Sequence, residues 1–562
     1  MLIQVLLFSI AFPNRWSRTS VALAQSATVT SFSVVSTATR TLSPTSTATV
    51  ASFPSTGSIP REYTPEGLEK LWDIIGPVEL PPFTTTRVPN AAVTLPPSLP
   101  PLYPSFYAHA PKNILPDMKY PKGFKFGVAT AAYQVEGAAK SEGKGPSMWD
   151  WTTRQPNAVY DNTTGDVVDL QYFLYKEDVQ RIAALGVNAH SFSISWPRIY
   201  PFGSADSPIN TAGIDHYSDV IDYHLAHGVE PVVTLFHWDT PVALQGYYGA
   251  FTSPKIVNDF VEYTFNEPSA YCGKMAAYPF NLTFAPGVNS STAFYQCAYN
   301  LLRAHAGAVK AFREMGISGE ISLKNNGDII RIGPFLNPIH ITGDWPDITK
   351  ETLPAEYLPR FTDEEKKVLL GSTDFFAFDV YSTVWVKAPD DGIDACVTNT
   401  SHPLWPGCNE HVYFDSDYGW STGPAAGPQA NSVEATPVPV RTWLKDIHSR
   451  WPSNKMYVSE FGTVEPFDYV GTDISPIKED VLRTNYFPTY LGEILLSIHE
   501  DGVPIQGAFT WSMIDNAEWL YGTAVRWHSC RFGIQHVDYT TLERTYKRSA
   551  LSLAEFFESH LQ

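Results

Sequence analysis

The sequence predicts an α/β fold, a (β/α)8 TIM barrel preceded by a disordered N-terminal extension rich in Ser, Thr and Pro. From Tyr120 onward, short apolar runs alternate with amphipathic helical stretches, a pattern typical of parallel strands joined by crossover helices. The chain has 562 residues, which is long enough for such a barrel with additions. Residues 25–60 are mostly Ser, Thr, Ala, Val and Pro with Arg40 as their only charge, so they cannot bury enough apolar surface to fold.

The composition divides the chain into four regions. The apolar run from Leu2 to Phe12 has the length of a signal peptide and is too short to span a bilayer, and residues 22–24 (Ala-Leu-Ala) offer a cleavage site. No later segment is long and apolar enough to cross a membrane, so we expect a secreted, extracellular protein without a membrane span. The expected regions are a signal peptide (1–24), a Ser/Thr-rich stalk (25–60), a short helix with a Pro-rich strap (61–117) and the barrel domain (118–562).

One helix is expected between the stalk and the barrel. Thr64 suits an N-cap, and Pro65 suits the first turn of a helix that continues to Ile75. The strap from Pro77 to about Pro116 follows, and we expect it to lie extended over the barrel surface or to be disordered.

Charge and cysteine usage restrict the partners and the compartment. The net charge of -19 and the pI near 5.2 argue against a nucleic-acid partner, which requires a basic face. The five cysteines show no zinc or redox spacing; Cys272 with Cys297, and Cys396 with Cys408, could each close a local loop and leave Cys530 free. Sequons for N-glycosylation also fit an oxidising, secretory environment, and they lie at Asn162, Asn281, Asn289 and Asn399.

Eight strands are expected in the barrel domain, with helices such as 169–185 and 298–315 between them. Each strand is a short apolar or β-branched run bounded by turn residues. The expected strands are Phe126–Thr130, Val187–Ser195, Pro231–Phe236, a short run just before Asn266, Glu320–Leu323, Asp374–Val380, Met456–Ser459 and Gln506–Trp511.

Two glutamates follow expected strands four and seven. Glu267 lies in a Thr-Phe-Asn-Glu-Pro turn, and Glu460 ends a β-branched and aromatic run before Gly462. The carboxyl ends of barrel strands are where such barrels build active sites. One carboxylic acid and one carboxylate facing each other are what glycosidic-bond cleavage requires. A single glutamate at a strand end is more often a surface residue, so the remaining motifs decide.

Several motifs in order resemble glycoside hydrolase family 1, and look most like the secreted fungal β-glucosidases within it. The resemblance runs from about Phe124 to the C-terminus. It rests on residues 129–137 (ATAAYQVEG), 234–239 (TLFHWD), 266–268 (NEP), 459–462 (SEFG) and 511–519 (WSMIDNAEW).

The resemblance implies a role for each matching residue. Glu267 corresponds to the acid/base, Glu460 to the nucleophile and Tyr381 to the tyrosine that orients the nucleophile. The positions that correspond to sugar-binding residues are Gln134, His237, Asn266, Trp511, Glu518, Trp519 and Phe532.

The implied activity is that of a retaining β-glucosidase on terminal β-D-glucosyl residues of cellobiose or of aryl or alkyl β-glucosides. The expected partner is a small β-glucoside or oligosaccharide, with neither metal nor organic cofactor. The carboxylate of Glu518 would repel a 6-phosphate, which favours an unphosphorylated sugar. Two alternatives remain: a catalytically impaired or non-catalytic sugar-binding member of the family, and a transglycosylase. The residues make no prediction about the oligomeric state.

The site departs from the family pattern at Ser191, where an arginine is usual. An arginine near the nucleophile would lower its pKa. Without it we expect a higher pKa for Glu460, unless His190 or another cation substitutes. The acidic limb of the pH profile of kcat/KM would then lie at higher pH. Asp379 stands where asparagine is common, and its charge acts in the same direction.

Two segments are shorter than is usual in the family, and one is longer. Between Ser253 and Glu267 there is too little chain for a full helix and a full strand, so either the helix is truncated or the barrel wall is thin there. After Asp328 the chain passes directly into a Pro-rich stretch, where a helix normally intervenes. The segment between Trp519 and Phe532 is longer than usual and includes residues 526–528 (Arg-Trp-His).

Overall fold

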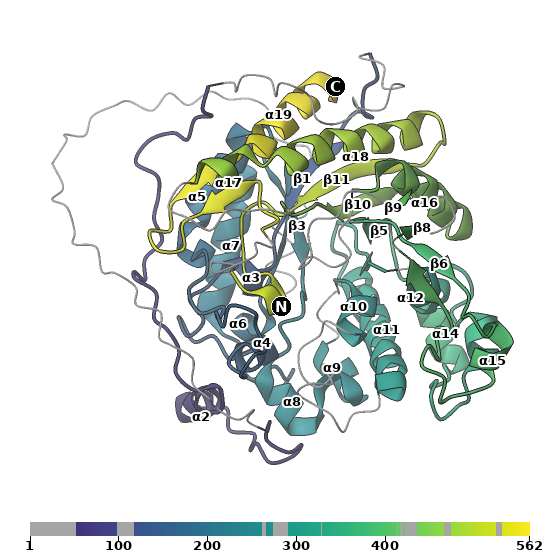
Figure 1. The fold of residues 1–562 in the computed structure, drawn as a ribbon. Coiled ribbons are helices and arrows are strands. Elements are labelled where there is room, and N and C mark those ends of the chain that lie inside the picture. The colour runs from purple at the N-terminus through teal and green to yellow at the C-terminus, as the bar shows by residue number, and fades with distance from the viewer. Residues whose placement is uncertain are drawn as a thin grey trace.

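The computed structural model describes residues 52–97, 117–260, 266–273, 290–327, 329–412, 414–415, 420–421, 435–465, 474–523 and 531–562. Parallel strands form the wall of a barrel, and helices surround it (Figure 1). The seven-stranded sheet has the order β3-β2-β1-β11-β10-β5-β4. The (β/α)8 barrel predicted from the sequence is confirmed. Its strands are β1 (Lys125–Ala129), β2 (Ala189–Ser193), β3 (Glu230–Thr234), β4 (Lys324–Asn325), β5 (Phe376–Asp379), β10 (Met456–Phe461) and β11 (Ile505–Trp511).

The wall closes between β3 and β4 through Asn266. Its amide donates to the carbonyl of Phe236 at 3.1 Å, and it forms a parallel bridge with Lys324. The amide of Glu267 then donates to the carbonyl of Lys324, also at 3.1 Å. The strand expected just before Asn266 falls on residues 261–265, which lie outside the described residues. Within the described residues the preceding helix α9 is Ile256–Phe260, which is followed directly by the residues that are not described.

The fifth strand lies later in the chain than expected. Residues 320–323, predicted as a strand, form no strand, and β4 follows them at Lys324–Asn325. One backbone bond joins these segments, from the amide of Asp374 to the carbonyl of Ile321, but side chains make two others. The amide of Ile321 donates to the Asp374 carboxylate at 2.9 Å, and the Ser322 hydroxyl donates to the carbonyl of Phe375 at 2.6 Å. Such local side-chain bonds compete with strand pairing.

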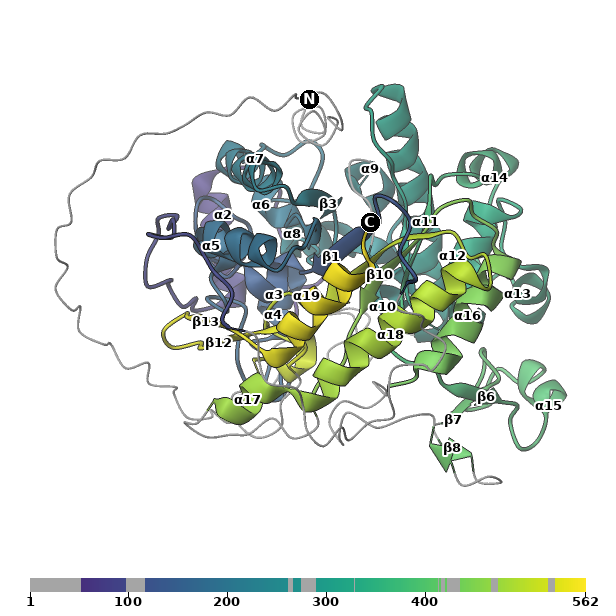
Figure 2. The same ribbon diagram turned by 90° about the horizontal axis from the view of Figure 1, so that it is seen from above.

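The helices cover the barrel on all sides, and α18 and α19 lie side by side over one flank (Figures 1 and 2). Expected helices 169–185 and 298–315 are present as α5 and the longer α11. In chain order the main helices are α2 (Pro65–Ile75), α3 (Ala132–Val135), α4 (Met148–Thr152), α5 (Gln171–Ala184), α6 (Trp196–Ile199), α7 (Thr211–Ala226), α8 (Val242–Tyr248), α9, α10 (Pro268–Cys272), α11 (Ser290–Glu314), α12 (Ile329–His340), α13 (Asp347–Thr352), α14 (Asp363–Leu369), α15 (Ile393–Val397), α16 (Pro437–Arg450), α17 (Ser475–Glu479), α18 (Val481–His499) and α19 (Arg548–His560).

Alternating side chains divide the barrel into an inner and an outer face. Phe376 and Phe378 of β5 point outward and pack with residues of α16 and α18 in one apolar cluster. Ala129 and Ala189 point inward and pack with Trp511 in another. Residues two apart share a face, so Asp379 follows Ala377 on the inner face and reaches the mouth of the barrel. None of the described helices combines the length and apolar character needed to cross a bilayer.

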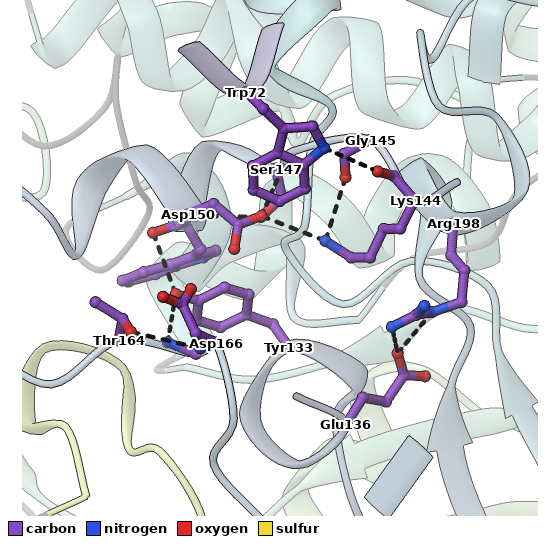
Figure 3. Close-up of polar contacts among 12 residues, drawn as sticks. Trp72, Tyr133, Glu136, Lys144, Gly145, Ser147, Asp150, Thr164, Asp166 and Arg198 are labelled. Atoms are coloured by element: carbon purple, nitrogen blue, oxygen red, sulfur yellow. Dashed lines mark hydrogen bonds and ion pairs between the residues drawn. The ribbon is translucent and has the colours of Figure 1, made fainter. Parts of the chain in front are cut away.

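Helix α2 fastens the described part of the N-terminal region to the barrel domain. Thr64 caps the helix by accepting a hydrogen bond from the amide of Gly67 at 3.1 Å, which confirms the predicted start. Trp72 is 2% exposed, and its indole N–H donates to the carbonyl of Lys144 at 3.0 Å (Figure 3). The ammonium of Lys144 in turn contacts the carboxylate of Asp150 at 3.3 Å. The expected signal peptide, residues 25–51 of the stalk and residues 98–116 of the strap lie outside the described residues.

The segment after Asn326 forms helix α12 directly. This helix accommodates Pro334 and Pro338, so the Pro-rich stretch is itself helical. Small antiparallel pairs complete the fold, and together with α15 the pair β6–β7 projects away from the barrel (Figures 1 and 2). They are β6 (Trp385–Lys387) with β7 (Glu410–Val412), β8 (Phe414–Asp415) with β9 (Trp420–Ser421), and β12 (Gln535–Val537) with β13 (Arg544–Tyr546), while the 3-10 turns are η1 (Ala250–Thr252) and η2 (Trp519–Tyr521).

Candidate active site

Two glutamates separated by almost two hundred residues meet at the carboxyl ends of the barrel strands. Glu267 immediately precedes α10, and Glu460 lies near the end of β10. Carboxylate oxygens of Glu267, Glu460 and Asp379 lie within 4.8 Å of one another, and all three side chains are buried. A direct attack by one carboxylate requires the two groups to be about 5 to 5.5 Å apart, whereas an intervening water requires about 6.5 to 9.5 Å. The spacing therefore suits direct attack.

The two oxygens of Glu460 have different partners. The Tyr381 hydroxyl donates to Oε2 at 2.6 Å, and the ammonium of Lys324 lies 2.6 Å from Oε1. Burial, followed by the Glu460 charge, raises the pKa of Tyr381 well above its ordinary value, so this hydroxyl keeps its proton and donates it. The hydroxyls of Tyr486 and Tyr490 on α18 donate to the carbonyl of Tyr381 at 3.1 and 3.0 Å, which fixes its position.

Glu267 is arranged to hold a proton. Burial, followed by the nearby Glu460 charge, raises its pKa to about 7, while the Asn326 amide and Lys324 act in the opposite direction. The side chain of Asn326 donates to Oε1 of Glu267. The backbone of Glu267 is left-handed, with φ 46°, and this turn directs the chain from the barrel wall into α10. Two carboxyl groups in environments that differ this way can act as acid and nucleophile.

His237 and Asn266 form one polar pair of the mouth. Asn266 Nδ2 lies 3.0 Å from His237 Nε2, and both side chains are buried. Burial, with the Lys324 charge as a smaller contribution, lowers the pKa of His237 well below its ordinary value, so the ring is neutral. The amide oxygen of Asn266 has no hydrogen-bond partner within the described protein and is available to a hydroxyl donor.

Gln134, Glu518 and Trp511 form a second polar group. The indole N–H of Trp511 donates to Glu518 Oε1 at 3.2 Å, and Gln134 Nε2 donates to Glu518 Oε2 at 3.4 Å. Burial raises the pKa of Glu518 to about 8. Gln134 Oε1 is another buried acceptor without a partner in the described protein. Unfilled acceptors beside a carboxyl group suit a ligand that carries several hydroxyls.

Aromatic rings connect these polar groups. Trp519 lies between Trp238 and Trp149, with ring centroids at 4.6 and 4.7 Å, and it stacks on His237 at 5.8 Å. Phe532 meets Tyr381 edge-on at 5.9 Å. The structure thus brings together all ten residues proposed from the sequence for chemistry or sugar binding.

Two disulfides join cysteines in the described part of the chain. Cys272 in α10 is joined to Cys297 in α11, and Cys396 in α15 is joined to Cys408. The first bond ties the short helix that follows Glu267 to a long helix on the barrel exterior, and this restrains the backbone next to that carboxyl group. Cys530 lies outside the described residues, as do residues 526–528.

Three residues at the site were missed as site residues in the sequence: Lys324, Asn326 and Asp379. Asp379 was noted only as a departure, and its Oδ1 accepts from the Ser459 hydroxyl at 2.6 Å. Lys324 directly follows the expected strand 320–323, and a cation at the carboxyl end of a barrel strand was the signal that could have identified it as a site residue. Three carboxylates at this spacing are ligands suited to a cation. The ammonium of Lys324 already supplies positive charge to Glu460 there.

His190 does not take the place of the missing arginine. Its ring lies 3.0 Å from the Thr130 hydroxyl and 2.8 Å from the ring of His224 on α7. It therefore points outward, away from the barrel interior. Burial, then the neighbouring His224, lowers the pKa of His190 well below its ordinary value, so the ring is uncharged.

Comparison with known proteins agrees with this geometry. The sequence model described as glycosyl hydrolase family 1 matches residues 117–331 and 324–561, and the two matches overlap at residues 324–331. β-Glucosidase 1B of Phanerodontia chrysosporium is 33% identical over 498 residues, covering 79% of this chain and 87% of that protein. Ipecac alkaloid β-glucosidase 9 of Carapichea ipecacuanha is 31% identical over 513 residues, covering 79% and 92%. The crystal structure of a family 1 β-glucosidase from the fungus Humicola insolens, in complex with glucose, is similar with a TM-score of 0.71 and 31% identity, over 79% of this chain and 99% of that one.

Proposed function

The chain belongs to glycosyl hydrolase family 1, and we propose that it is a retaining β-glucosidase acting on terminal non-reducing β-D-glucosyl residues. The observation that carries the proposal is the pair of buried carboxyl groups, Glu267 and Glu460, with oxygens within 4.8 Å. One of them has its pKa raised to about 7, and the other is paired with Lys324. Cellobiose and aryl or alkyl β-glucosides are the proposed substrates.

The proposed reaction has two displacements. Glu267 gives its proton to the glycosidic oxygen while the carboxylate of Glu460 attacks the anomeric carbon, so the C–O bond to the leaving group breaks and a glycosyl ester forms. Tyr381 holds the second oxygen of Glu460 during attack. Water then gives a proton to the ionised Glu267 and attacks the same carbon, which releases glucose with its original β configuration and regenerates both carboxyl groups.

Sugar selection is assigned to the surrounding polar groups. Asn266 is placed next to the acid and would bind the 2-hydroxyl, whose hydrogen bonds strengthen at the transition state. Glu518 and Gln134 would bind two adjacent hydroxyls, with Trp511 and Trp519 against the ring face. Above about pH 8, where Glu518 is ionised, its carboxylate would repel a 6-phosphate, which supports an unphosphorylated sugar under those conditions. The alternative of a non-catalytic sugar-binding protein is not favoured, because both carboxyl groups and their partners are assembled.

The test uses p-nitrophenyl β-D-glucoside and cellobiose with three variants. Glu460→Gln should abolish turnover of both substrates. Glu267→Gln should lose cellobiose hydrolysis more completely than aryl glucoside hydrolysis, since nitrophenolate leaves without protonation. Glu320→Gln, which removes only the carboxylate that pairs with Lys455 before β10, is the matched control and should remain active. Proton NMR at early times should show β-glucose first. Activity that survives Glu460→Gln, or α-glucose as the first product, would refute the proposal.

We also propose that the protein acts outside the cell. The two disulfides of the described residues support an oxidising compartment, since disulfides are rare in the cytosol. Recovery of the protein from the medium of a secreting host, with a new N-terminus near Gln25, is the expected result. Retention inside the cell with Met1 intact would contradict it.

A further inference from the structure

The second strand of the barrel supplies no positive charge to the nucleophile. Ala189 packs inward with Trp511, so Ser191, two residues later on β2, lies on the same inner face. Ser191 is buried and carries only a hydroxyl. His190 points to α7 on the other face and is neutral. A buried carboxylate that must stay ionised to attack therefore needs a cation from another strand.

Lys324 brings that cation from β4, on the opposite side of the site in the strand order. Its ammonium lies 2.6 Å from Glu460 Oε1, and the two side chains are 12% and 3% exposed. Lys324 also pairs with Ala377 of β5 and bridges Asn266, and its carbonyl accepts from the amide of Glu267. One residue thus holds the nucleophile with its side chain and the acid with its backbone.

Within the part of the chain that the structure describes, several acidic groups and one cation, Lys324, surround Glu460. Asp379 faces it from β5, Glu267 from the start of α10 and Glu518 from the segment after β11, and the Tyr381 hydroxyl donates to its second oxygen. Burial, then the Glu460 charge, raises the pKa of Asp379 well above its ordinary value, so burial favours the uncharged form of Asp379. Glu267 and Glu518 also have raised pKa values, of about 7 and about 8. The ammonium of Lys324 is therefore balanced by Glu460.

We infer that Lys324 is a positioning residue: from β4 its ammonium holds the Glu460 carboxylate in place and supplies the positive charge that Ser191 on β2 does not provide. This inference rests on the proposed function. It assigns to Lys324 a role in the reaction's pH dependence.

The experiment is a double-mutant cycle between Lys324→Met and Ser191→Arg, read as kcat/KM against pH for an aryl β-glucoside. An opposite charge at this distance lowers a carboxyl pKa by about 1 to 3 units, so Lys324→Met should move the acidic limb upward by about 1 to 3 pH units. Below the limb this equals a loss of about 10- to 1,000-fold in kcat/KM. Ser191→Arg should move the limb back in the Lys324→Met background, and it should shift the limb less in the wild type.

Two further variants keep the test decisive. Lys324→Arg retains the charge and should keep the limb within about half a pH unit of the wild type. If melting shows that Lys324→Met does not fold, Lys324→Gln takes its place, because its amide still donates to Glu460 but carries no charge, and the same upward displacement is expected. Identical limbs in the wild type and the uncharged variant, or equal effects of Ser191→Arg in both backgrounds, would overturn the inference.

A second readout separates this inference from the proposed function. A glucose-configured cyclitol epoxide labels an ionised carboxylate nucleophile without turnover, and mass spectrometry gives the labelling rate at Glu460. A wild type that hydrolyses no β-glucoside but is labelled with a Lys324-dependent pH profile refutes the function and supports the role of Lys324. A wild type that is active, with labelling independent of Lys324, supports the function and overturns the inference.

Discussion

Removal of the Tyr381 hydroxyl tests how much the orientation of Glu460 contributes to catalysis. The hydroxyl is buried, donates to Glu460 Oε2 at 2.6 Å and keeps its proton because its pKa is raised well above the ordinary value. A hydrogen bond to a charged group contributes about 1.5 to 3 kcal/mol. Since about 1.36 kcal/mol changes a rate tenfold, Tyr381→Phe should lower kcat/KM about 10- to 150-fold.

The sign of the pH effect is also fixed by this geometry. A hydrogen bond donated to a carboxylate stabilises its negative charge, so loss of the Tyr381 hydroxyl should move the acidic limb of kcat/KM upward. The assay is nitrophenol release from an aryl β-glucoside over a range of pH, with the melting temperature as a folding control.

Tyr486→Phe is the matched control for this variant. Its hydroxyl donates at 3.1 Å to the carbonyl of Tyr381 and not to Glu460, and that carbonyl still accepts from Tyr490. It should keep most of the activity and the wild-type limb. Loss of activity in both variants to the same extent, or an unshifted limb in Tyr381→Phe, would refute the reasoning.

Two other predictions concern stability. Burial raises the pKa of Glu518 to about 8 from an ordinary 4.5, so the folded state binds the proton more tightly and stability falls as pH rises from about 4.5 to about 8. The melting temperature of Glu518→Gln, measured relative to that of the wild type, should therefore rise between pH 5 and pH 8. A difference in melting temperature that does not change with pH would contradict this. Removal of the Cys272–Cys297 bond by double substitution to serine should cost about 3.5 kcal/mol for a loop of 25 residues, and should lower kcat/KM because α10 follows Glu267. The same change at Cys396 and Cys408, a loop of 12 residues, should cost about 3 kcal/mol and leave kcat/KM unchanged, as measured by urea denaturation and initial rates; equal kinetic effects would contradict a specific restraint on α10.

Local sequence rules sufficed where local chemistry decides the structure. Thr64 followed by Pro65 placed the start of α2, and the apolar runs placed β1, β2, β3, β5, β10 and β11 close to their observed bounds. The site residues lie in recognisable motifs at strand ends. The barrel topology brings such ends together, so Glu267 and Glu460 could be paired without coordinates.

The remaining features depend on contacts between distant segments. The strand expected at residues 320–323 was wrong because two bonds to the segment before β5 involve side chains. The amide of Ile321 donates to the Asp374 carboxylate, and the Ser322 hydroxyl donates to the carbonyl of Phe375, about fifty residues away in sequence. Lys324 was missed because its partner is set by the register of β4 against β5 and not by neighbours in the chain. His190 stood next to Ser191, yet strand alternation turns it to the opposite face.

The closure of the wall at Asn266 has a consequence for how ligand binding and local opening are linked. Within the described residues, the amides of Asn266 and Glu267 join this position to the neighbouring strands, so a fluctuation that releases these two protons to solvent also separates the acid from Glu460. A sugar bound to Asn266 and Glu267 would stabilise these two amide hydrogen bonds. Sugar binding should therefore slow deuterium uptake at these amides more than at those in the middle of β1, so their exchange rate would report how much of the protein has sugar bound.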